Sequence, residues 1–105
     1  MGAWTLINEH EIIASAKTSS FLPCGRIQFV EDHENPPSRA YLKIQESLVH
    51  FQTFFGDFPQ EGQHCFEAGA CPGGWTYVLV QLGCSVFAVD RSPLVDKLMA
   101  DPKVK

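Results

Sequence analysis

The stretch of this sequence that decides the fold is Gln63 to Tyr77, which reads QHCFEAGACPGGWTY. Residues 63–68 predict a buried strand, because the run is short, largely apolar and followed by glycines. Residues 69–74 predict a tight loop, and the apolar residues after it return at helical spacing. The stretch therefore predicts a strand, a glycine-rich loop and a helix in immediate succession.

The residues after this stretch continue the alternation. An apolar stripe at helical spacing predicts a helix over residues 75–82. Residues 85–89 predict a second strand, apolar and rich in β-branched side chains, which ends at Asp90. Ser92 and Pro93 are suited to the cap and first position of another short helix, which we expect to run through Ala100.

Before the decisive stretch lies a longer helical pattern. Apolar residues recur there at steps of three and four, namely Ala40, Ile44, Leu48, Phe51 and Phe55. Pro36 and Pro37 stop any earlier element from continuing into this helix. We expect Ser38 to cap the helix and Gly56 to end it.

The first third of the chain carries weaker signals. Apolar pieces at residues 4–7, 12–14 and 26–30 predict short strands or one short helix. A polar, proline-closed linker follows them. The sequence therefore predicts two regions, an N-terminal segment over residues 1–35 and the N-terminal part of a Rossmann-like domain over residues 36–105.

The order of elements from residue 38 onward predicts an α/β fold. Helices that alternate with strands form a parallel sheet with right-handed crossovers, and residues 103–105 are expected to open a third strand. Ligands of such sheets sit at the carboxyl ends of the strands. We therefore expect the loop at residues 69–74 and Asp90 to lie side by side at one binding edge.

Two kinds of cofactor compete for this loop. A dinucleotide fingerprint would place a glycine at position 71, where this chain has Cys71, and Pro72 lacks a backbone N–H for a diphosphate. S-adenosylmethionine has no phosphate, and it needs a close backbone turn and a carboxylate for its ribose hydroxyls. Asp90 offers that carboxylate. The alternatives are an ordinary turn at Gly73-Gly74 and a simple helix cap at Asp90. The loop, the helix, the second strand and its terminal acid occur together in register, however, and this combination favours S-adenosylmethionine.

The composition narrows the function classes. With 45% hydrophobic and 19% charged residues the chain is expected to be globular, and its net charge of −4 includes no basic patch for nucleic acid. The four cysteines, Cys24, Cys65, Cys71 and Cys84, lack metal-ligand spacing, so we expect no metal site and a reduced, cytoplasmic setting. Apolar runs are too short to span a membrane, and we expect no membrane partner.

Three segments of the chain resemble a known family. Residues 66–77, Pro36 to Glu46 and Val89 to Leu94 resemble motifs of the FtsJ-like (RrmJ-type) RNA 2′-O-ribose methyltransferases. Within the family, the similarity is greatest to the members that methylate a cytidine ribose in 23S ribosomal RNA. The resemblance covers about residues 36–104. It implies a Rossmann-like fold, S-adenosylmethionine as cofactor and ribosomal RNA as the substrate of the full-length parent.

The resemblance also implies roles for individual residues. The loop around the methionine part of the cofactor would consist of Gly69, Cys71, Pro72, Gly73, Gly74 and Trp75. Asp90 would bind the cofactor's ribose. Lys43 matches the first lysine of a Lys-Asp-Lys-Glu tetrad around the target 2′-hydroxyl. Because a ribose hydroxyl is a poor nucleophile, a lysine that removes or stabilises its proton would assist the reaction; without the motif, Lys43 would be an ordinary solvated helix lysine.

The chain also departs from the family pattern. Glu67 stands where these relatives usually have Asp, and Ala40 replaces a Ser of some relatives. The three later tetrad positions lie beyond the last residue of this sequence. We therefore expect a truncated domain that does not methylate alone and that self-associates through uncovered strands. A non-catalytic cofactor-binding or interaction protein, and a methyltransferase with a non-RNA substrate, are the alternatives.

Overall fold

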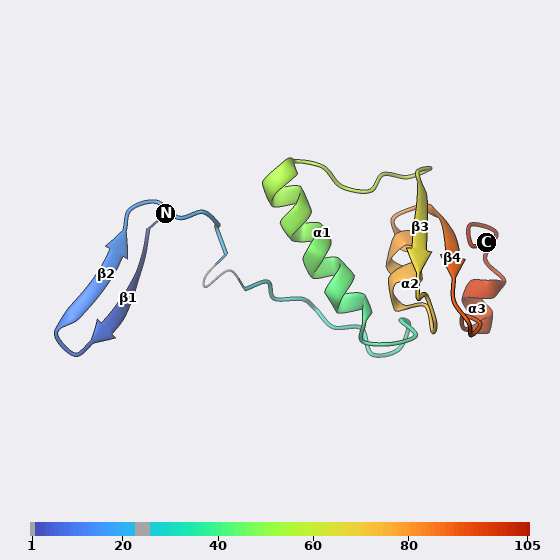
Figure 1. Ribbon diagram of the computed structural model, residues 1–105, viewed down its shortest axis with the longest axis horizontal. Helices are drawn as coiled ribbons and strands as arrows, with labels where there is room; N and C mark the ends of the chain where they lie inside the picture. Colours follow the sequence, from blue (N-terminus) through green and yellow to red (C-terminus); the bar gives the residue numbers. More distant parts are fainter. Residues whose placement is uncertain (1, 23–25) are drawn as a thin grey trace.

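The computed structural model describes residues 2–22 and 26–105, and Figure 1 shows how their helices and strands are arranged. From residue 41 onward the elements are α1 (Tyr41–Phe55), β3 (His64–Ala68), α2 (Gly74–Gln81), β4 (Ser85–Val89) and α3 (Asp96–Met99). Helices and strands alternate in the predicted order. The α/β class is therefore confirmed.

The strands β3 and β4 are parallel neighbours. Their register pairs Cys65 with Val86 and Glu67 with Ala88 on one face, and Phe66 with Phe87 on the other. On the far side of β4, Val86 forms a parallel bridge with Val104. The expected opening of a third strand at residues 103–105 is thus present as a single bridge, with β4 in the middle of the sheet.

Helix α1 starts later than the sequence predicts. Its N-cap is Ala40, and the expected cap at Ser38 is wrong. The Ser38 hydroxyl instead accepts a 3.3 Å hydrogen bond from the Ala40 N–H, within a turn that precedes the helix. The predicted end is confirmed, because Gly56 adopts the left-handed conformation and donates its N–H to the Gln52 carbonyl at 2.8 Å.

Helix α3 is shorter than the predicted helix over residues 93–100, and Ser92 does not cap it. The Ser92 N–H is held by the Asp90 carboxylate at 3.1 Å, and the Val95 N–H donates to the Pro72 carbonyl at 3.1 Å. These two bonds keep residues 92–95 out of the helical conformation. The helix begins only at Asp96.

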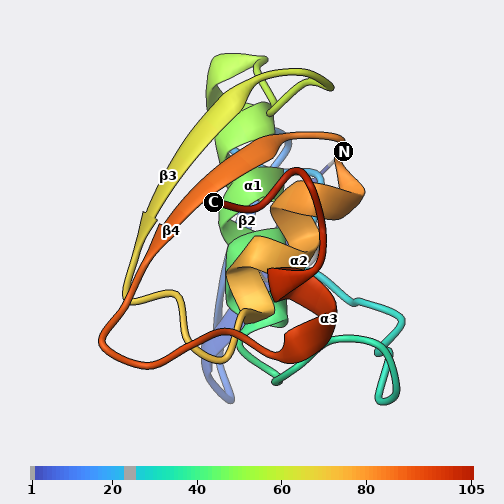
Figure 2. The ribbon, with the colours of Figure 1, turned by 90° about the vertical axis from the view of Figure 1, so that its right-hand side faces the viewer.

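Both longer helices cover the same face of the sheet (Figure 2). The core between helices and sheet is formed by Tyr41, Ile44, Val78, Leu79, Val80, Cys84 and Val86. The opposite face is open, with Phe66 70% and Phe87 56% exposed. The predicted stripe of α1 is only half covered, because Ile44 is buried whereas Phe51 and Phe55 are exposed.

The N-terminal region forms an antiparallel hairpin of β1 (Ala3–Asn8) and β2 (Glu11–Ser15), which Figure 1 shows apart from the helices. Two of the three predicted apolar pieces are therefore strands, whereas residues 26–30 have no regular secondary structure. Cys24 lies outside the described residues. Among the residues that the structure describes, no helix is long and apolar enough to cross a membrane.

Candidate functional site

The loop at residues 69–73 connects β3 to α2 at the carboxyl ends of both strands. The N–H groups of Gly69 and Ala70 donate to the Val89 carbonyl at 2.8 and 3.3 Å. These bonds close the loop over the end of β4. Asp90 directly follows Val89 in the chain, so it lies beside the loop, as predicted.

Asp90 ties two loops together. One carboxylate oxygen accepts the Cys71 N–H at 2.8 Å, and the other accepts the Ser92 N–H at 3.1 Å. The hydrogen bonds from Ser92 and then Cys71 hold the pKa of this exposed carboxyl below its ordinary value of 3.8. Asp90 is therefore a charged acceptor that is already fixed in orientation.

The two glycines before α2 have packing roles. Gly73 has φ +117°, and a Cβ there would overlap the Leu98 Cδ1. A Cβ on Gly74 would lie 2.7 Å from the Ser38 Oγ and 3.2 Å from the Tyr41 N. The positive φ at position 73 therefore favours glycine, and a side chain at position 74 would crowd the start of α1.

Trp75 reaches across to the start of α1. Its indole Nε1–H donates to the Ala40 carbonyl at 3.1 Å, a contact between residues 35 positions apart. The side chain is not core, because Trp75 is 43% exposed. The first turn of α2 is therefore bound to the first turn of α1 beside the loop.

Glu67 is a buried acid that the sequence reasoning noted only as a departure from the family. It is 7% exposed, and its Oε2 accepts a hydrogen bond from the Thr76 hydroxyl at 2.6 Å. Burial raises the pKa of Glu67 above its ordinary value of 4.5, and the Thr76 hydrogen bond opposes that shift. An acidic residue inside an apolar strand is the signal in the sequence that could have identified it.

These elements enclose a hollow of about 140 Å³. Its lining consists of Ser38, Ala40, Glu67, Ala68, Gly69, Ala70, Cys71, Pro72, Gly74 and Trp75. The lining includes the acidic residue Glu67 and no lysine or arginine. Gly69 has φ +75° and open space where a Cβ would stand, so its backbone can be approached closely from outside.

A second hollow, of about 230 Å³, adjoins the loop. Asp90, Arg91 and Ser92 line it together with residues 93–94, 99 and 104–105. Ala70 and Ala88 complete its lining, and Ala70 also lines the first hollow. A ligand longer than the first hollow could therefore extend over the loop toward Asp90.

Lys43 lies at the third position of α1 and is exposed. It does not line either hollow. Its backbone N–H donates to the Ala40 carbonyl at 3.1 Å, and Ala40 lines the first hollow. The predicted site residues that line the first hollow are Gly69, Cys71, Pro72, Gly74 and Trp75. Gly73 does not line it, Asp90 lines the second hollow, and Lys43 is one helical turn away.

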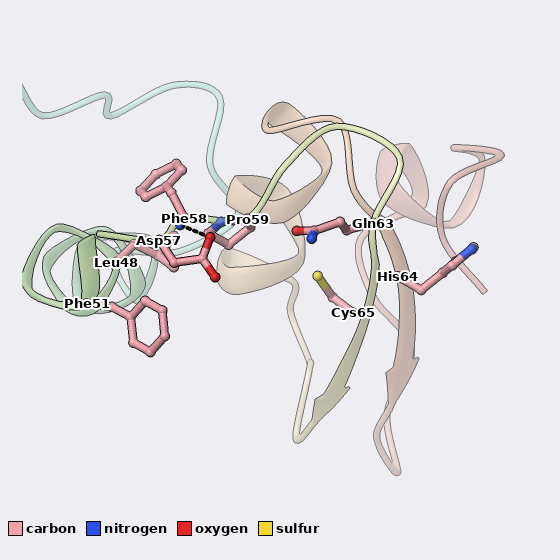
Figure 3. A pocket seen from close by; sticks show the side chains of 8 residues that line it. All are labelled: Leu48, Phe51, Asp57, Phe58, Pro59, Gln63, His64 and Cys65. Carbon is pink, nitrogen blue, oxygen red and sulfur yellow. Dashed lines mark hydrogen bonds between the residues drawn. The ribbon is translucent and has the colours of Figure 1, made fainter. Parts of the chain in front are cut away.

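A larger hollow lies elsewhere, with a volume of about 670 Å³. Figure 3 shows Leu48 and Phe51 of α1 on one side of it, and Gln63, which precedes β3, with Cys65 of β3 on the other. It lies away from the carboxyl ends of the strands. Within the described ranges, 2–22 and 26–105, no three His, Cys, Asp or Glu side chains are grouped to hold a metal ion.

Comparisons with known proteins all point to similarity with methyltransferases. The family model described as FtsJ-like methyltransferase matches residues 36–105. A protein of Halorhodospira halophila named "Ribosomal RNA large subunit methyltransferase M" is 42% identical over 71 residues, which are 68% of this chain and 21% of that protein. Proteins of the same name from Shewanella woodyi and Shewanella oneidensis are 38% and 35% identical, and the matches cover 86% and 89% of this chain. They cover 25% and 26% of those proteins, so the chain spans about a quarter of their length.

Proposed function

The chain belongs to the FtsJ-like methyltransferase family, and from that membership we propose that it supplies the S-adenosylmethionine-binding part of a ribosomal RNA methyltransferase. We assign residues 36–105 to the N-terminal part of a Rossmann-like domain and residues 1–35 to a separate N-terminal segment. The parallel pair β3 and β4, with α2 between them, is the unit that such domains use to bind their cofactor at the carboxyl ends of the strands.

The charge of the first hollow carries this proposal. Its lining includes a buried acid, Glu67, and no basic side chain. A diphosphate ligand would be repelled by Glu67 and would find no cation there. S-adenosylmethionine carries a sulfonium and an ammonium group, and a cation beside Glu67 would favour the ionised form of a carboxyl that burial disfavours. The residues present thus fit a cationic ligand better than an anionic one.

The remaining contacts follow from the geometry of the loop. The open backbone at Gly69 and the lining residues Cys71, Pro72 and Gly74 would receive the methionine part, with Gly73 shaping the turn and the ring of Trp75 at the rim. Asp90, beside the second hollow, would accept hydrogen bonds from the ribose hydroxyls. Two backbone N–H groups already fix the orientation of its carboxylate. Ligand binding therefore costs little additional conformational entropy at this side chain.

We assign the catalytic role to Lys43. Bound S-adenosylmethionine supplies a methyl group that is activated by the adjacent positive sulfur. The chain's contribution is to orient the acceptor and to manage its proton. Lys43 projects from the turn of α1 that begins beside the first hollow, where an ammonium group would stabilise the negative charge that develops on a ribose 2′-hydroxyl as its proton leaves. RNA as the acceptor rests on the names of the relatives. A cytoplasmic setting rests on the free cysteines Cys65, Cys71 and Cys84, which fit a reducing compartment.

Calorimetric titration of the 105-residue chain with S-adenosylmethionine and with NAD tests the cofactor assignment. We expect S-adenosylmethionine to bind more tightly than NAD. Asp90→Ala should weaken S-adenosylmethionine at least about tenfold, because a charged hydrogen-bond acceptor and the anchor of the loop are both lost. Asp57→Ala is the matched control, since Asp57 is an exposed carboxylate that accepts a backbone N–H far from the loop.

Two results would contradict the assignment. Tighter binding of NAD than of S-adenosylmethionine would favour a nicotinamide cofactor. Equal affinities of the Asp90→Ala and Asp57→Ala variants for S-adenosylmethionine would remove Asp90 from the site.

A further inference from the structure

The Ala40 carbonyl receives two donors that come from different parts of the proposed site. The Trp75 indole N–H donates to it at 3.1 Å, and the Lys43 backbone N–H donates to it at 3.1 Å. One oxygen atom therefore connects the helix that follows the cofactor loop with the helical turn that carries Lys43. The connection is specific in direction, because the indole N–H is the only polar atom that a tryptophan side chain has.

The residues on either side of Trp75 also join separate elements. Gly74 lies so close to the start of α1 that a Cβ would be 3.2 Å from the Tyr41 N. The Thr76 hydroxyl donates to the Glu67 carboxylate on β3 at 2.6 Å. Three consecutive residues thus bind the first turn of α2 to α1 and to β3. Trp75 is the one of the three whose side chain forms a directional bond to α1.

Packing alone does not explain a tryptophan at position 75. The side chain is 43% exposed, and it is absent from the group of buried residues that joins α1, α2 and β4. A leucine or phenylalanine could also supply apolar contact at such a position. Neither could donate a hydrogen bond to the Ala40 carbonyl. The feature that distinguishes tryptophan here is its N–H.

We propose that Trp75 is a positioning residue, whose indole N–H holds the first turn of α1, and with it Lys43, in a fixed place relative to the cofactor loop. The proposal rests on the catalytic role of Lys43 proposed above. Transfer between a bound donor and a bound acceptor depends steeply on alignment, and a displacement of about 1 Å can lower the rate about a hundredfold. A side chain that sets the distance between Lys43 and the loop therefore acts on the rate and not on cofactor affinity.

Hydrogen exchange in the 105-residue chain tests the physical link without any activity. The chain contains two tryptophans, Trp4 and Trp75, and Trp4 is 70% exposed. With ¹⁵N-labelled protein, the Trp75 indole proton should exchange at least about tenfold more slowly than the Trp4 indole proton. In Trp75→Phe the Lys43 amide should exchange faster, whereas Trp4→Phe should leave it unchanged. Equal indole exchange rates, or an unchanged Lys43 amide in Trp75→Phe, would overturn the proposal.

A double-mutant cycle in a methyltransferase that joins this chain to the later strands of the domain tests the consequence for catalysis. Trp75→Phe keeps an aromatic ring at the rim of the hollow, so the KM for S-adenosylmethionine should change less than about twofold while kcat for methyl incorporation into undermodified ribosomal RNA falls about tenfold. In a Lys43→Ala background the same substitution should have no further effect on kcat. Trp4→Phe is the control with unchanged activity.

The outcomes separate this proposal from the one on which it rests. If Lys43→Ala leaves kcat unchanged, the catalytic assignment of Lys43 is wrong, and the positioning role fails with it. If Lys43→Ala lowers kcat but Trp75→Phe lowers it equally in both backgrounds, Trp75 acts independently of Lys43 and only the positioning role is overturned. A rise in KM with unchanged kcat would make Trp75 a cofactor contact and would also overturn it.

Discussion

The hydrogen bond between Thr76 and Glu67 provides the sharpest test of how the site is stabilised. Thr76 is fully buried at the start of α2, and its hydroxyl donates to the carboxyl of Glu67 at 2.6 Å. Thr76→Val replaces this hydroxyl by a methyl group of similar volume and changes helix propensity little. The substitution therefore removes one hydrogen bond from a buried carboxyl and little else.

The expected cost follows from the charge of the acceptor. An O–H···O distance of 2.6 Å is typical of a hydrogen bond to an ionised carboxylate. Such bonds contribute about 1.5–3 kcal/mol, compared with about 1 kcal/mol for a neutral pair. Because the bond lowers the pKa of Glu67, its loss should cost more at a pH above the folded-state pKa, where the ionised form prevails, than at pH 4, below the ordinary value of 4.5, where the protonated form prevails.

Urea unfolding of the 105-residue chain at low protein concentration measures this cost. Thr53→Val is the matched control, because Thr53 is exposed on α1 and donates to the Val49 carbonyl at 2.8 Å within its own helix. We expect the control to change the free energy of unfolding by less than about 0.5 kcal/mol. A Thr76→Val variant as stable as the control at pH 8, or a cost that does not depend on pH, would refute the account of a buried, hydrogen-bonded carboxylate.

Three further outcomes are expected. Burial raises the pKa of Glu67 in the folded state, so the wild type should lose stability relative to Glu67→Gln as the pH rises above about 4.5, the ordinary pKa. The difference in the free energy of unfolding should become constant above the folded-state pKa. Urea unfolding from pH 4 to 8 measures this difference, and a difference that shrinks with rising pH would contradict the expected sign. Gly73→Ala should cost at least about 1–3 kcal/mol in the same assay, because φ +117° strains any L side chain and the Cβ would overlap Leu98, whereas a neutral result would contradict the packing role of this glycine. The chain should self-associate through the open sheet face, and Phe66→Ser with Phe87→Ser should shift it toward the monomer in size exclusion with light scattering; an unchanged mass in the double variant would exclude this face as the contact.

The strands and the loop could be predicted from the sequence because their signals are local. Strand β4 has the predicted bounds, residues 85–89, and β3 begins one residue later than the predicted strand over residues 63–68. Short apolar runs punctuated by glycines fix such elements without help from distant residues. The position of Asp90 beside the loop followed from a general property of parallel sheets.

The features that could not be predicted depend on contacts between distant residues. Ser38 was expected to cap α1, but the helix begins at Tyr41, where residues 38–41 pack against Gly74. The short α3 results from bonds that Asp90 and Pro72 make to Ser92 and Val95. Periodicity also does not show which residues of an apolar stripe pack against another element. The exposure of Phe51 and Phe55 could therefore not be predicted from the sequence.

The hydrogen bond between the side chains of Glu67 and Thr76 has an evolutionary consequence. Gly73, Gly74 and Asp90 each have a structural task, so a lineage that stopped binding a cofactor would still be selected to keep them. Burying the carboxyl of Glu67 costs free energy when no cation is nearby, so replacing both Glu67 and Thr76 by apolar residues could be neutral or stabilising. We expect descendants that have lost the cofactor to retain the glycines and Asp90 while position 67 becomes apolar and position 76 changes with it. Substitution at this pair, rather than in the glycine motif, would mark the members of the family that have become scaffolds.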